Sequence, residues 1–549
     1  MPSLTKETKS TAWHAQPLDY EVIAIGAGVC GLYQTYRLQK MGIKFLTLEA
    51  GSDVGGTWYW NRYPGARFDS ESFTYAYSFS KELLDEWDWS ERFAGQPETE
   101  AYFQYVAKKF DLRKNIQFNT RVASARYNEE NRSWTVLCAD GREYTTRFLV
   151  TAIGVLSAPT RPRYKGMDKF KGQSFHTFDW PSEPLDFARL RVGIIGTGST
   201  GVQIISEIAD KVADLTVFQR RPNWCAPLRN RPITKEEMAE IRASYDKIFA
   251  RCAQTPGGFI HGPDDRATFD VPEAERLAFW EQLYAAPGFG KWLGNFRDIL
   301  MDATANAEFT RFMSAKIRER INDPALAEKL IPKDHQFGTR RVPLETNYYE
   351  CYNRDNVHLV DISETPILEI TEKGVLTSDR EYEFDLLIYA TGFDAITGAY
   401  DRIDFVGENG VYLRDKWADG PLTALGVMTT GFPNLLTMAG PQSGSAGQNF
   451  PRGIEEVINW WSELLEYIRG NGYTKIEPKQ ELEDAWLEHV IKMGDGALLG
   501  KEKSWFSGYN TNLDREYKPR YLIYMGGAPR YRKRLAEQAQ SNYSGFNFS

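Results

Sequence analysis

The stretch YEVIAIGAGVCGLYQTYRLQKMGIKFLTLEA, residues 20–50, is the strongest indication of the fold in this sequence. It predicts a buried strand over residues 20–25, a helix over 32–40 and a second, parallel strand over 45–48. The turn between the first strand and the helix carries glycines at three fixed positions: Gly26, Gly28 and Gly31. The first glycine permits the tight turn, the second lets the backbone approach a pyrophosphate, and the third lets helix and strand pack closely. A pyrophosphate is then expected at the helix N-terminus, where free N–H groups and the helix dipole favour negative charge.

An acid, Glu49, follows the second strand, eighteen residues after Gly31. At this position a carboxylate can accept hydrogen bonds from a ribose hydroxyl. A glycine triplet alone occurs in many loops, but here strand, triplet, helix, strand and terminal acid come in order. Residues 20–50 therefore predict a dinucleotide-binding βαβ unit.

A second copy of this pattern, RVGIIGTGSTGVQIISEIADKVADLTVFQRRP, covers residues 191–222. It predicts a strand over 191–195, a turn starting at Gly196, a helix over 202–208 and a strand over 215–218. The turn and the first part of the helix are expected to contact the nucleotide through Thr197, Gly198, Ser199, Thr200, Gly201 and Gln203.

The second copy ends in Arg220 and Arg221 instead of an acid. A carboxylate there would repel a 2′-phosphate, whereas guanidinium groups bind phosphate in a bidentate way. The second site is therefore predicted to prefer NADP over NAD. The alternative explanation is that the two arginines belong to a solvated loop.

Two dinucleotide sites in one chain indicate a flavoprotein that is reduced by a nicotinamide. The predicted fold class is α/β, with two Rossmann-like domains for FAD and NADP and a helical insertion in the NADP domain. EFDLLIYATGFD, residues 383–394, predicts the strand from which the chain returns to the FAD domain, and Asp140-Gly141 predicts a hairpin turn. The expected segments are the first part of the FAD domain (1–150), a linker with the first part of the NADP domain (151–226), the helical insertion with mostly solvated charges (227–333), the second part of the NADP domain (334–389) and the second part of the FAD domain (390–549).

The composition excludes several classes of protein. The chain of 549 residues has a net charge of −8, which argues against nucleic-acid binding and gives no polybasic membrane anchor. Its five cysteines form no Cys-x-x-Cys pair, so neither a disulfide framework, a zinc ribbon nor any other metal site is expected. No signal peptide and no membrane-spanning apolar run are found, so a cytoplasmic enzyme without membrane contact is expected.

Two features limit the reactions that the reduced flavin can carry out. They are the five unpaired cysteines and the stretch GGTWYWNRYPGARFD, residues 55–69. Disulfide reductases with two dinucleotide sites need a redox-active cysteine pair, so oxygen chemistry is favoured here. Trp58, Tyr59, Trp60 and Tyr63 offer bulky walls that would exclude water from a reactive intermediate. Asp69 is the single carboxylate in this stretch, and it needs a cationic partner if it is buried.

Two further patterns resemble the class B flavin monooxygenases and, within them, the Baeyer–Villiger monooxygenases. FKGQSFHTFDWP, residues 170–181, is too irregular to predict a helix or an alternating strand, but it matches the short signature F-x-G-x-x-x-H-x-x-x-W-(P/D) of that family. The matching residues are Phe170, Gly172, His176, Trp180 and Pro181. The longer signature, (A/G)-G-x-W-x-x-x-x-(F/Y)-P-(G/M)-x-x-x-D, is matched by Gly55, Gly56, Trp58, Tyr63, Pro64, Gly65 and Asp69. The resemblance covers essentially the whole chain.

The resemblance implies an NADPH- and O2-consuming enzyme that binds FAD and converts a small-molecule ketone to an ester or lactone through a flavin peroxide. A monomer or homodimer is expected. Two alternatives stay open: an N- or S-oxygenating flavin monooxygenase, against which Trp180 and Asp69 argue, and a non-catalytic NADP-binding scaffold.

The resemblance also implies roles for single residues. Arg341, in FGTRRVPLETNYYE, is the expected catalytic cation, with Asp69 as its partner. Arg340 is expected at the 2′-phosphate, and Trp505 at the nicotinamide ribose. His176 is expected to act in domain positioning within a linker, not as a general base. The substrate-side loop is expected at Asn449 and Phe450, where GPQSGSAGQNF departs from the commonest family wording and leaves the substrate open. The remaining expected cofactor contacts are Thr57, Trp58, Tyr59, Trp60, Arg67, Tyr75 and Val122.

Overall fold

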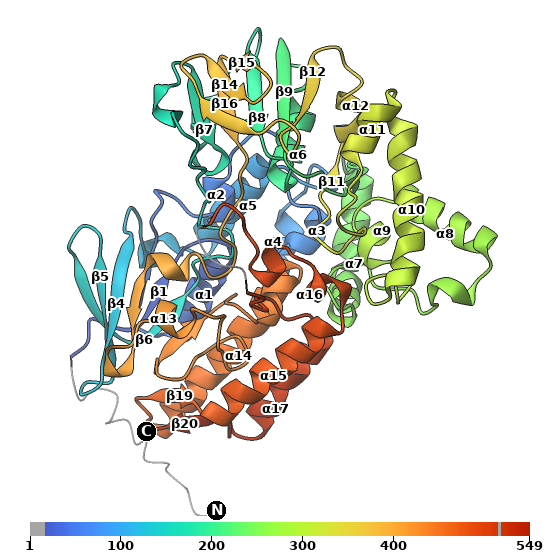
Figure 1. The fold of residues 1–549 in the computed structure, drawn as a ribbon. Coiled ribbons are helices and arrows are strands. Elements are labelled where there is room, and N and C mark those ends of the chain that lie inside the picture. The colour runs from blue at the N-terminus through green and yellow to red at the C-terminus, as the bar shows by residue number, and fades with distance from the viewer. Residues whose placement is uncertain (1–16, 514–517) are drawn as a thin grey trace, which may run out of the picture.

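The computed structural model describes residues 17–513 and 518–549. Its largest sheet has eight strands in the order β17-β4-β5-β6-β1-β2-β3, with β18 paired to β6, and it lies at the lower left of Figure 1. These strands are β1 (Tyr20–Ile25), β2 (Phe45–Leu48), β3 (Ile116–Gln117), β4 (Val122–Asn128), β5 (Ser133–Cys138), β6 (Glu143–Thr151), β17 (Asp404–Val406) and β18 (Leu435–Thr437). Strands β5 and β6 pair antiparallel around Asp140-Gly141, so the predicted hairpin is confirmed.

The first predicted βαβ unit forms the centre of this sheet. Strand β1 pairs in parallel with both β2 and β6, and helix α1 (Val29–Lys40) connects β1 to β2. The helix begins three residues earlier than predicted because Gly31 lies in its first turn and not in the preceding loop. The same holds for α6 (Ser199–Ile208), which contains Gly201.

A second, fully parallel sheet has the order β12-β9-β8-β16-β7 and lies at the top of Figure 1. All four neighbouring pairs are parallel, which is typical of a sheet whose strands are connected through helices. The strands are β7 (Gln173–His176), β8 (Arg191–Ile195), β9 (Asp214–Gln219), β12 (Val357–Asp361) and β16 (Leu386–Tyr389). The two sheets confirm the predicted α/β fold class, while the domain boundaries stay a prediction.

The prediction that residues 170–181 contain no regular strand is wrong. Strand β7 forms the edge of the second sheet and pairs with β16 so that His176 lies opposite Tyr389. The strand is only four residues long, too short for its pattern of burial to show in the sequence. Gly172 lets the chain approach the sheet closely, because a Cβ atom there would lie 2.6 Å from the carbonyl oxygen of Asp385.

The predicted helical insertion consists of five helices, seen in green and yellow-green at the right of Figure 1. They are α7 (Lys235–Gln254), α8 (Glu273–Ala285), α9 (Gly290–Leu293), α10 (Ala303–Arg320) and α11 (Pro324–Leu330). At the base of the insertion, β10 (Ala226–Pro227) pairs in parallel with β11 (Leu344–Glu345).

The five helices do not share one core. Met238, Ile241 and Tyr245 of α7 pack in the hydrophobic core of the first sheet. Trp280 of α8 and Phe309 of α10 pack instead in the core of the second sheet. The insertion therefore spans both halves of the molecule.

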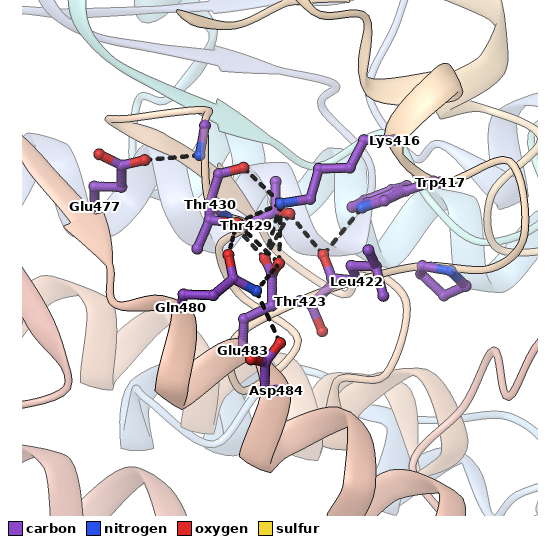
Figure 2. Close-up of polar contacts among 12 residues, drawn as sticks. Lys416, Trp417, Leu422, Thr423, Thr429, Thr430, Glu477, Gln480, Glu483 and Asp484 are labelled. Atoms are coloured by element: carbon purple, nitrogen blue, oxygen red, sulfur yellow. Dashed lines mark hydrogen bonds and ion pairs between the residues drawn. The ribbon is translucent and has the colours of Figure 1, made fainter.

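The C-terminal helices cover the first sheet. Helix α14 (Phe450–Asn471) packs against α1, and α15 (Gln480–Asp495) and α17 (Ala528–Gln540) lie beside it at the bottom of Figure 1. Figure 2 shows how α15 is held: Glu483 is buried and accepts hydrogen bonds from Lys416 Nζ at 2.9 Å, Thr429 Oγ1 at 2.9 Å and Thr430 N at 2.8 Å. This cluster ties α15 to the loop that precedes β18.

The remaining elements are short, apart from α5. The strands are β13 (Ile367–Ile370), β14 (Gly374–Thr377), β15 (Glu381–Glu383), β19 (Ile476–Pro478) and β20 (Phe546–Phe548). The helices are α2 (Thr57–Trp60), α3 (Ser72–Tyr75), α4 (Lys81–Glu86), α5 (Gln96–Lys109), α12 (Tyr348–Cys351), α13 (Leu413–Lys416) and α16 (Leu498–Lys501). Within the described ranges, none of the helices has both the length and the apolar composition that crossing a membrane requires.

Candidate active site

One large cavity of about 1150 Å³ is lined by residues from every part of the fold. Its walls include Gly28 of the first glycine turn, Gly198 of the second, Trp292 of the insertion and Asn449 before α14. Two nucleotides and a substrate would therefore share one space.

The first glycine turn has the geometry that a pyrophosphate requires. Gly26 has a φ of +102°, and a Cβ atom on Gly31 would lie 1.8 Å from its carbonyl oxygen. Gly31 thus serves helix–strand packing and does not line the cavity. Gly28 does line it, opposite Gly56, whose Cα atom would be 3.1 Å from a Cβ on Gly28. A larger side chain on either glycine would contact the other residue and cover the backbone that faces the cavity.

Glu49 lies buried at the end of β2 and lines the cavity. Its carboxylate accepts hydrogen bonds from the backbone N–H groups of Ala27 and Gly51, both at 2.6 Å. Burial raises the pKa of this carboxyl group. Each oxygen keeps a further lone pair, so the predicted contact with a ribose hydroxyl fits the geometry.

The second glycine turn repeats this design. Gly196 has a φ of +112°, and a Cβ on Gly201 would lie 2.2 Å from the Gly196 carbonyl oxygen. A Cβ on Gly198 would meet nothing within 4 Å, so this position opens to the cavity. The cavity wall also contains Thr197, Ser199, Thr200 and Gln203. These turns fit two dinucleotides.

Three arginines line the cavity near the second turn, and their partners differ. Arg340 donates to Glu502 at 2.7 Å and to Asp334 at 3.1 Å, and Arg221 lies 3.8 Å from Asp334. Arg220 has no ion-pair partner among the described residues. Arg220 is thus the cation most available to a 2′-phosphate.

Arg341 and Asp69 form the pair that the sequence predicts. Arg341 Nη2 donates to Asp69 Oδ2 at 2.8 Å, and Asp69 is buried. The guanidinium lies over the rings of Phe289, at 5.1 Å, and Trp292, at 5.7 Å. Leu344 N donates to the same oxygen of Asp69 at 3.1 Å, while the buried Oδ1 has no hydrogen-bond partner among the described residues. A cation is therefore fixed in the cavity between a carboxylate and two aromatic faces.

Known proteins with this architecture identify the family. A family model described as pyridine nucleotide-disulphide oxidoreductase matches residues 23–282. The chain is 48% identical to the 2-oxo-Δ(3)-4,5,5-trimethylcyclopentenylacetyl-CoA monooxygenase of Pseudomonas putida, over 96% of this chain and 98% of that one. It is 41% identical to the methyl acetate-forming acetone monooxygenase of Gordonia sp. (strain TY-5), over 96% and 99% of the two chains. The chain belongs to the Baeyer–Villiger monooxygenases.

A solved structure of the complex of OTEMO with FAD and NADP agrees with this assignment. It matches with a TM-score of 0.94 and 46% identity, covering 97% of this chain and 100% of that one. The present chain is therefore an enzyme that binds FAD and NADP(H) and uses O2 and NADPH to convert ketones to esters or lactones. The relatives named above support this activity over N- or S-oxygenation and over a non-catalytic scaffold.

The five cysteines of the monooxygenase are all free and buried. Cys30 lines the cavity, but burial raises the pKa of its thiol, which keeps it protonated. Dithiol chemistry is thus not available at this position, in agreement with the sequence analysis.

One pair of residues and a single lysine near the Arg341–Asp69 pair were not found from the sequence. His261 lines the cavity, and its Nε2 lies 2.8 Å from Oε1 of Glu71, which is completely buried. Lys291 is also completely buried and donates to the carbonyl oxygens of Pro227, Ala286 and Gly288 at 2.8, 2.8 and 3.1 Å. Burial, and to a smaller extent the charge of Arg229, lower the pKa of Lys291 to about 7, while the charges of Glu345 and Glu71 act in the opposite direction. Lys291 fixes the turn that carries Phe289 and Trp292.

The signals for these residues in the sequence are weak. Glu71 follows Asp69 by two residues, but nothing in one sequence distinguishes it from a solvated acid. His261 and Lys291 lie in the insertion, where charged positions mostly indicate a solvated face. Lys291 is an exception to that prediction because its ammonium group replaces water with backbone carbonyl groups.

The matched residues of the short signature, within 170–181, lie outside the cavity wall. His176 is buried, its Nδ1 accepts from Phe178 N at 3.2 Å, and its ring lies 6.2 Å from that of Phe393. Burial lowers the pKa of His176 to about 4, so the ring is neutral near pH 7. Trp180 packs between Phe175 and Phe187. Phe170 and Gly172 likewise do not line the cavity.

Of the other predicted contacts, Tyr59 lies outside the cavity wall, whereas Asn449 and the remaining residues line it. Tyr59 does not line the cavity, and its hydroxyl lies 2.9 Å from Ser52 Oγ. Asn449 is buried and donates to Thr74 Oγ1 at 3.2 Å. The remaining predicted residues on the cavity wall are Thr57, Trp58, Trp60, Arg67, Tyr75, Val122, Phe450 and Trp505. Their roles toward FAD, NADP and substrate stay predictions.

Proposed function

We propose that this Baeyer–Villiger monooxygenase oxidises a ketone on a five-membered ring to a lactone, and that its substrate carries an acyl-CoA side chain. The relative from Pseudomonas putida is named for a substrate of this class, and it shares 48% identity with this chain over nearly its full length. The single observation that carries the reaction type is the Arg341–Asp69 pair, fixed in the cavity that both glycine turns line.

The reaction balances as ketone, O2, NADPH and one proton giving lactone, water and NADP⁺. FAD, when bound, supplies the transfer of electrons from NADPH to O2. One oxygen atom enters the bond between the carbonyl carbon and its neighbour, which breaks one C–C bond and forms two C–O bonds to the inserted atom in the lactone ring. The second oxygen atom leaves as water.

Arg341 is proposed to stabilise the negative charge that develops on oxygen during this insertion. A fixed cation in a site of low polarity stabilises such charge more than water does, because it needs no reorganisation. Asp69 holds the guanidinium in place through the 2.8 Å bond, and Phe289 and Trp292 cover its faces. Aromatic walls at Trp58 and Trp60 are proposed to exclude water from the reacting atoms.

The cellular setting is a proposal of the same kind. Five unpaired, buried cysteines support a reducing compartment such as the cytoplasm. A monomer or homodimer is proposed as the functional form.

The reaction type is tested by supplying the purified, FAD-loaded enzyme with NADPH and a 2-alkylcyclopentanone under ¹⁸O2. Mass spectrometry should find one labelled oxygen in the ring of the lactone. An aryl methyl sulfide of similar size, supplied in a parallel reaction, is the control. Formation of sulfoxide with no lactone from any cyclic ketone would overturn the proposal.

A further inference from the structure

A second cavity, of about 550 Å³, lies beside the large one and is formed mainly by helix α17. Arg530, Lys533, Arg534 and Glu537 line it and follow the spacing i, i+3, i+4, i+7, so they share one face of the helix. The opposite face, with Tyr531 and Leu535, is buried in the core of the first sheet. The basic face is therefore fixed toward the cavity.

The charge of this cavity contrasts with that of the whole chain, which carries −8. Arg534 pairs with Glu537 at 3.1 Å, but the guanidinium of Arg530 contacts the sulfur of Met493 at 2.9 Å in place of a carboxylate. Lys533 has no ion-pair partner among the described residues. Arg530 and Lys533 thus form no ion pair with a carboxylate among the described residues, although Glu537 lies on the same face of the helix. His489 lies in the same positive surroundings. Burial lowers its pKa, and the charges of Arg534 and Arg530 lower it further.

The second cavity adjoins the substrate side of the large one. Pro256 and Gly527 line both cavities, and the Ala528 N–H donates to the Pro256 carbonyl oxygen at 2.8 Å. His489, on the wall of the second cavity, is 2.9 Å from the hydroxyl of Tyr524, which lines the first.

Gly257 follows Pro256, which lines both cavities, and it contacts the predicted substrate-side loop. Asn449 N donates to the carbonyl oxygen of Gly257 at 2.8 Å. The arginines proposed for the 2′-phosphate, Arg220 and Arg340, line the large cavity and do not line the cavity at α17. The basic face of α17 thus adjoins the space left for a substrate.

We infer that the cavity at α17 binds the phosphate groups of a CoA thioester whose acyl end, bearing the ketone, enters the large cavity. This inference rests on the proposed function, since it assigns a place to the CoA part of the proposed substrate. Guanidinium and ammonium groups form charge-assisted hydrogen bonds with phosphate oxygens, and a simple ketone has no group that would use them. Exposed cations without acidic partners are free to form these bonds.

The kinetic test compares two thioesters of 2-oxocyclopentylacetic acid, one with CoA and one with N-acetylcysteamine, which lacks every phosphate. In the double variant Arg530→Gln/Lys533→Gln, the KM for the CoA thioester should rise about tenfold or more. The kcat, the KM for the N-acetylcysteamine thioester and the KM for NADPH should not change. The double variant Lys40→Gln/Lys108→Gln removes the same charge from exposed lysines of α1 and α5 and is the matched control.

A binding measurement separates this inference from the proposed function. Calorimetric titration of CoA alone into enzyme saturated with FAD and NADP⁺ should show binding, and the Arg530→Gln/Lys533→Gln variant should lose it. If neither thioester is oxidised, the proposed substrate is wrong. The calorimetric titration still shows whether the cavity at α17 binds CoA.

CoA contains an adenosine phosphate and could instead occupy the nucleotide site. Arg220→Ala should raise the KM for NADPH and leave the KM for the CoA thioester unchanged. The inference is overturned if Arg220→Ala raises the thioester KM while the α17 variant does not. It is overturned equally if the α17 variant binds CoA as tightly as the unmodified enzyme.

Discussion

Two buried carboxylates of this enzyme each pair with one cation, yet they differ in how completely their oxygens are bonded. Both oxygens of Glu483 accept hydrogen bonds, from Lys416, Thr429 and Thr430 (Figure 2). Asp69 bonds only through Oδ2, while Oδ1 is buried and unpaired among the described residues. Lys416 and Glu483 also lie outside the wall of the large cavity, whereas Asp69 and Arg341 are part of it.

This difference distinguishes a structural ion pair from a functional one. A closed cluster satisfies every buried polar atom and so stabilises the fold. A pair that lines a cavity and contains an unsatisfied oxygen keeps bonding capacity beyond the pair itself. Substitutions of Lys416 and Arg341 test this distinction directly.

Lys416→Met should destabilise the fold and leave the chemistry intact. Removing one partner of a buried pair leaves an uncompensated charge on Glu483, which costs about 3–5 kcal/mol. Thermal denaturation should show a clear fall in Tm, while kcat at low temperature should stay that of the unmodified enzyme. Lys479→Met, at an exposed position at the start of α15, is the control and should change neither quantity. An unchanged Tm for Lys416→Met would remove the structural half of the comparison.

Arg341→Ala should have the opposite profile. Loss of a fixed charge near developing negative charge typically lowers kcat by about 100- to 1000-fold, or about 2.7–4 kcal/mol. FAD content, read from the absorbance spectrum, should remain near that of the unmodified enzyme. Tm should fall less than in Lys416→Met, because Asp69 lines the cavity and keeps the hydrogen bond from Leu344 N. Arg341→Lys keeps the charge without the bidentate fork and should give an intermediate rate. Ketone oxidation by Arg341→Ala at the unmodified rate would contradict the catalytic role.

The sequence predicted the parts of this site that local patterns encode. The two glycine turns, the parallel strands and the Arg341–Asp69 pair follow from spacing and from a family signature. The His261–Glu71 pair and the buried Lys291 do not, because only the folded chain brings the insertion against residues 69–71. The edge strand at 173–176 was missed for a related reason: a pairing partner more than 200 residues later defines it.

Arg220→Ala should raise the KM for NADPH and leave that for NADH unchanged. A charge-assisted contact with the 2′-phosphate is worth about 1.5–3 kcal/mol, which corresponds to roughly 10- to 150-fold. Arg340→Ala should have a smaller effect, because Glu502 and Asp334 already neutralise that guanidinium. Equal use of both nucleotides by the unmodified enzyme would refute the assignment of the second site to NADP.

His176→Asn should give the smallest effect, and the size of that effect depends on pH. The folded-state pKa of about 4 lies below the ordinary value of 6.5, so the unfolded chain binds the extra proton between these values. The stability that the neutral ring contributes is complete above pH 6.5 and is lost as the pH falls toward 4. The plot of Tm against pH should therefore be flatter for His176→Asn in that window.

A role of His176 in domain positioning would change the reaction kinetics and not only the pH dependence of Tm. Stopped-flow traces at pH 7 should then show a slower flavin reduction or a shorter-lived oxygenating species in the variant. Traces identical to those of the unmodified enzyme would leave His176 with packing alone.

The division of the helical insertion between two cores restricts how this enzyme can be recombined with its relatives. Helix α7 packs with the first sheet, whereas α8, α10 and α11 pack with the second. An exchange of residues 227–333 as one block would therefore bring a foreign helix into a core that evolved with another partner, where close packing tolerates little change of shape. A chimera designed with its crossover between Gln254 and Glu273 keeps each helix with the core it was selected to fill.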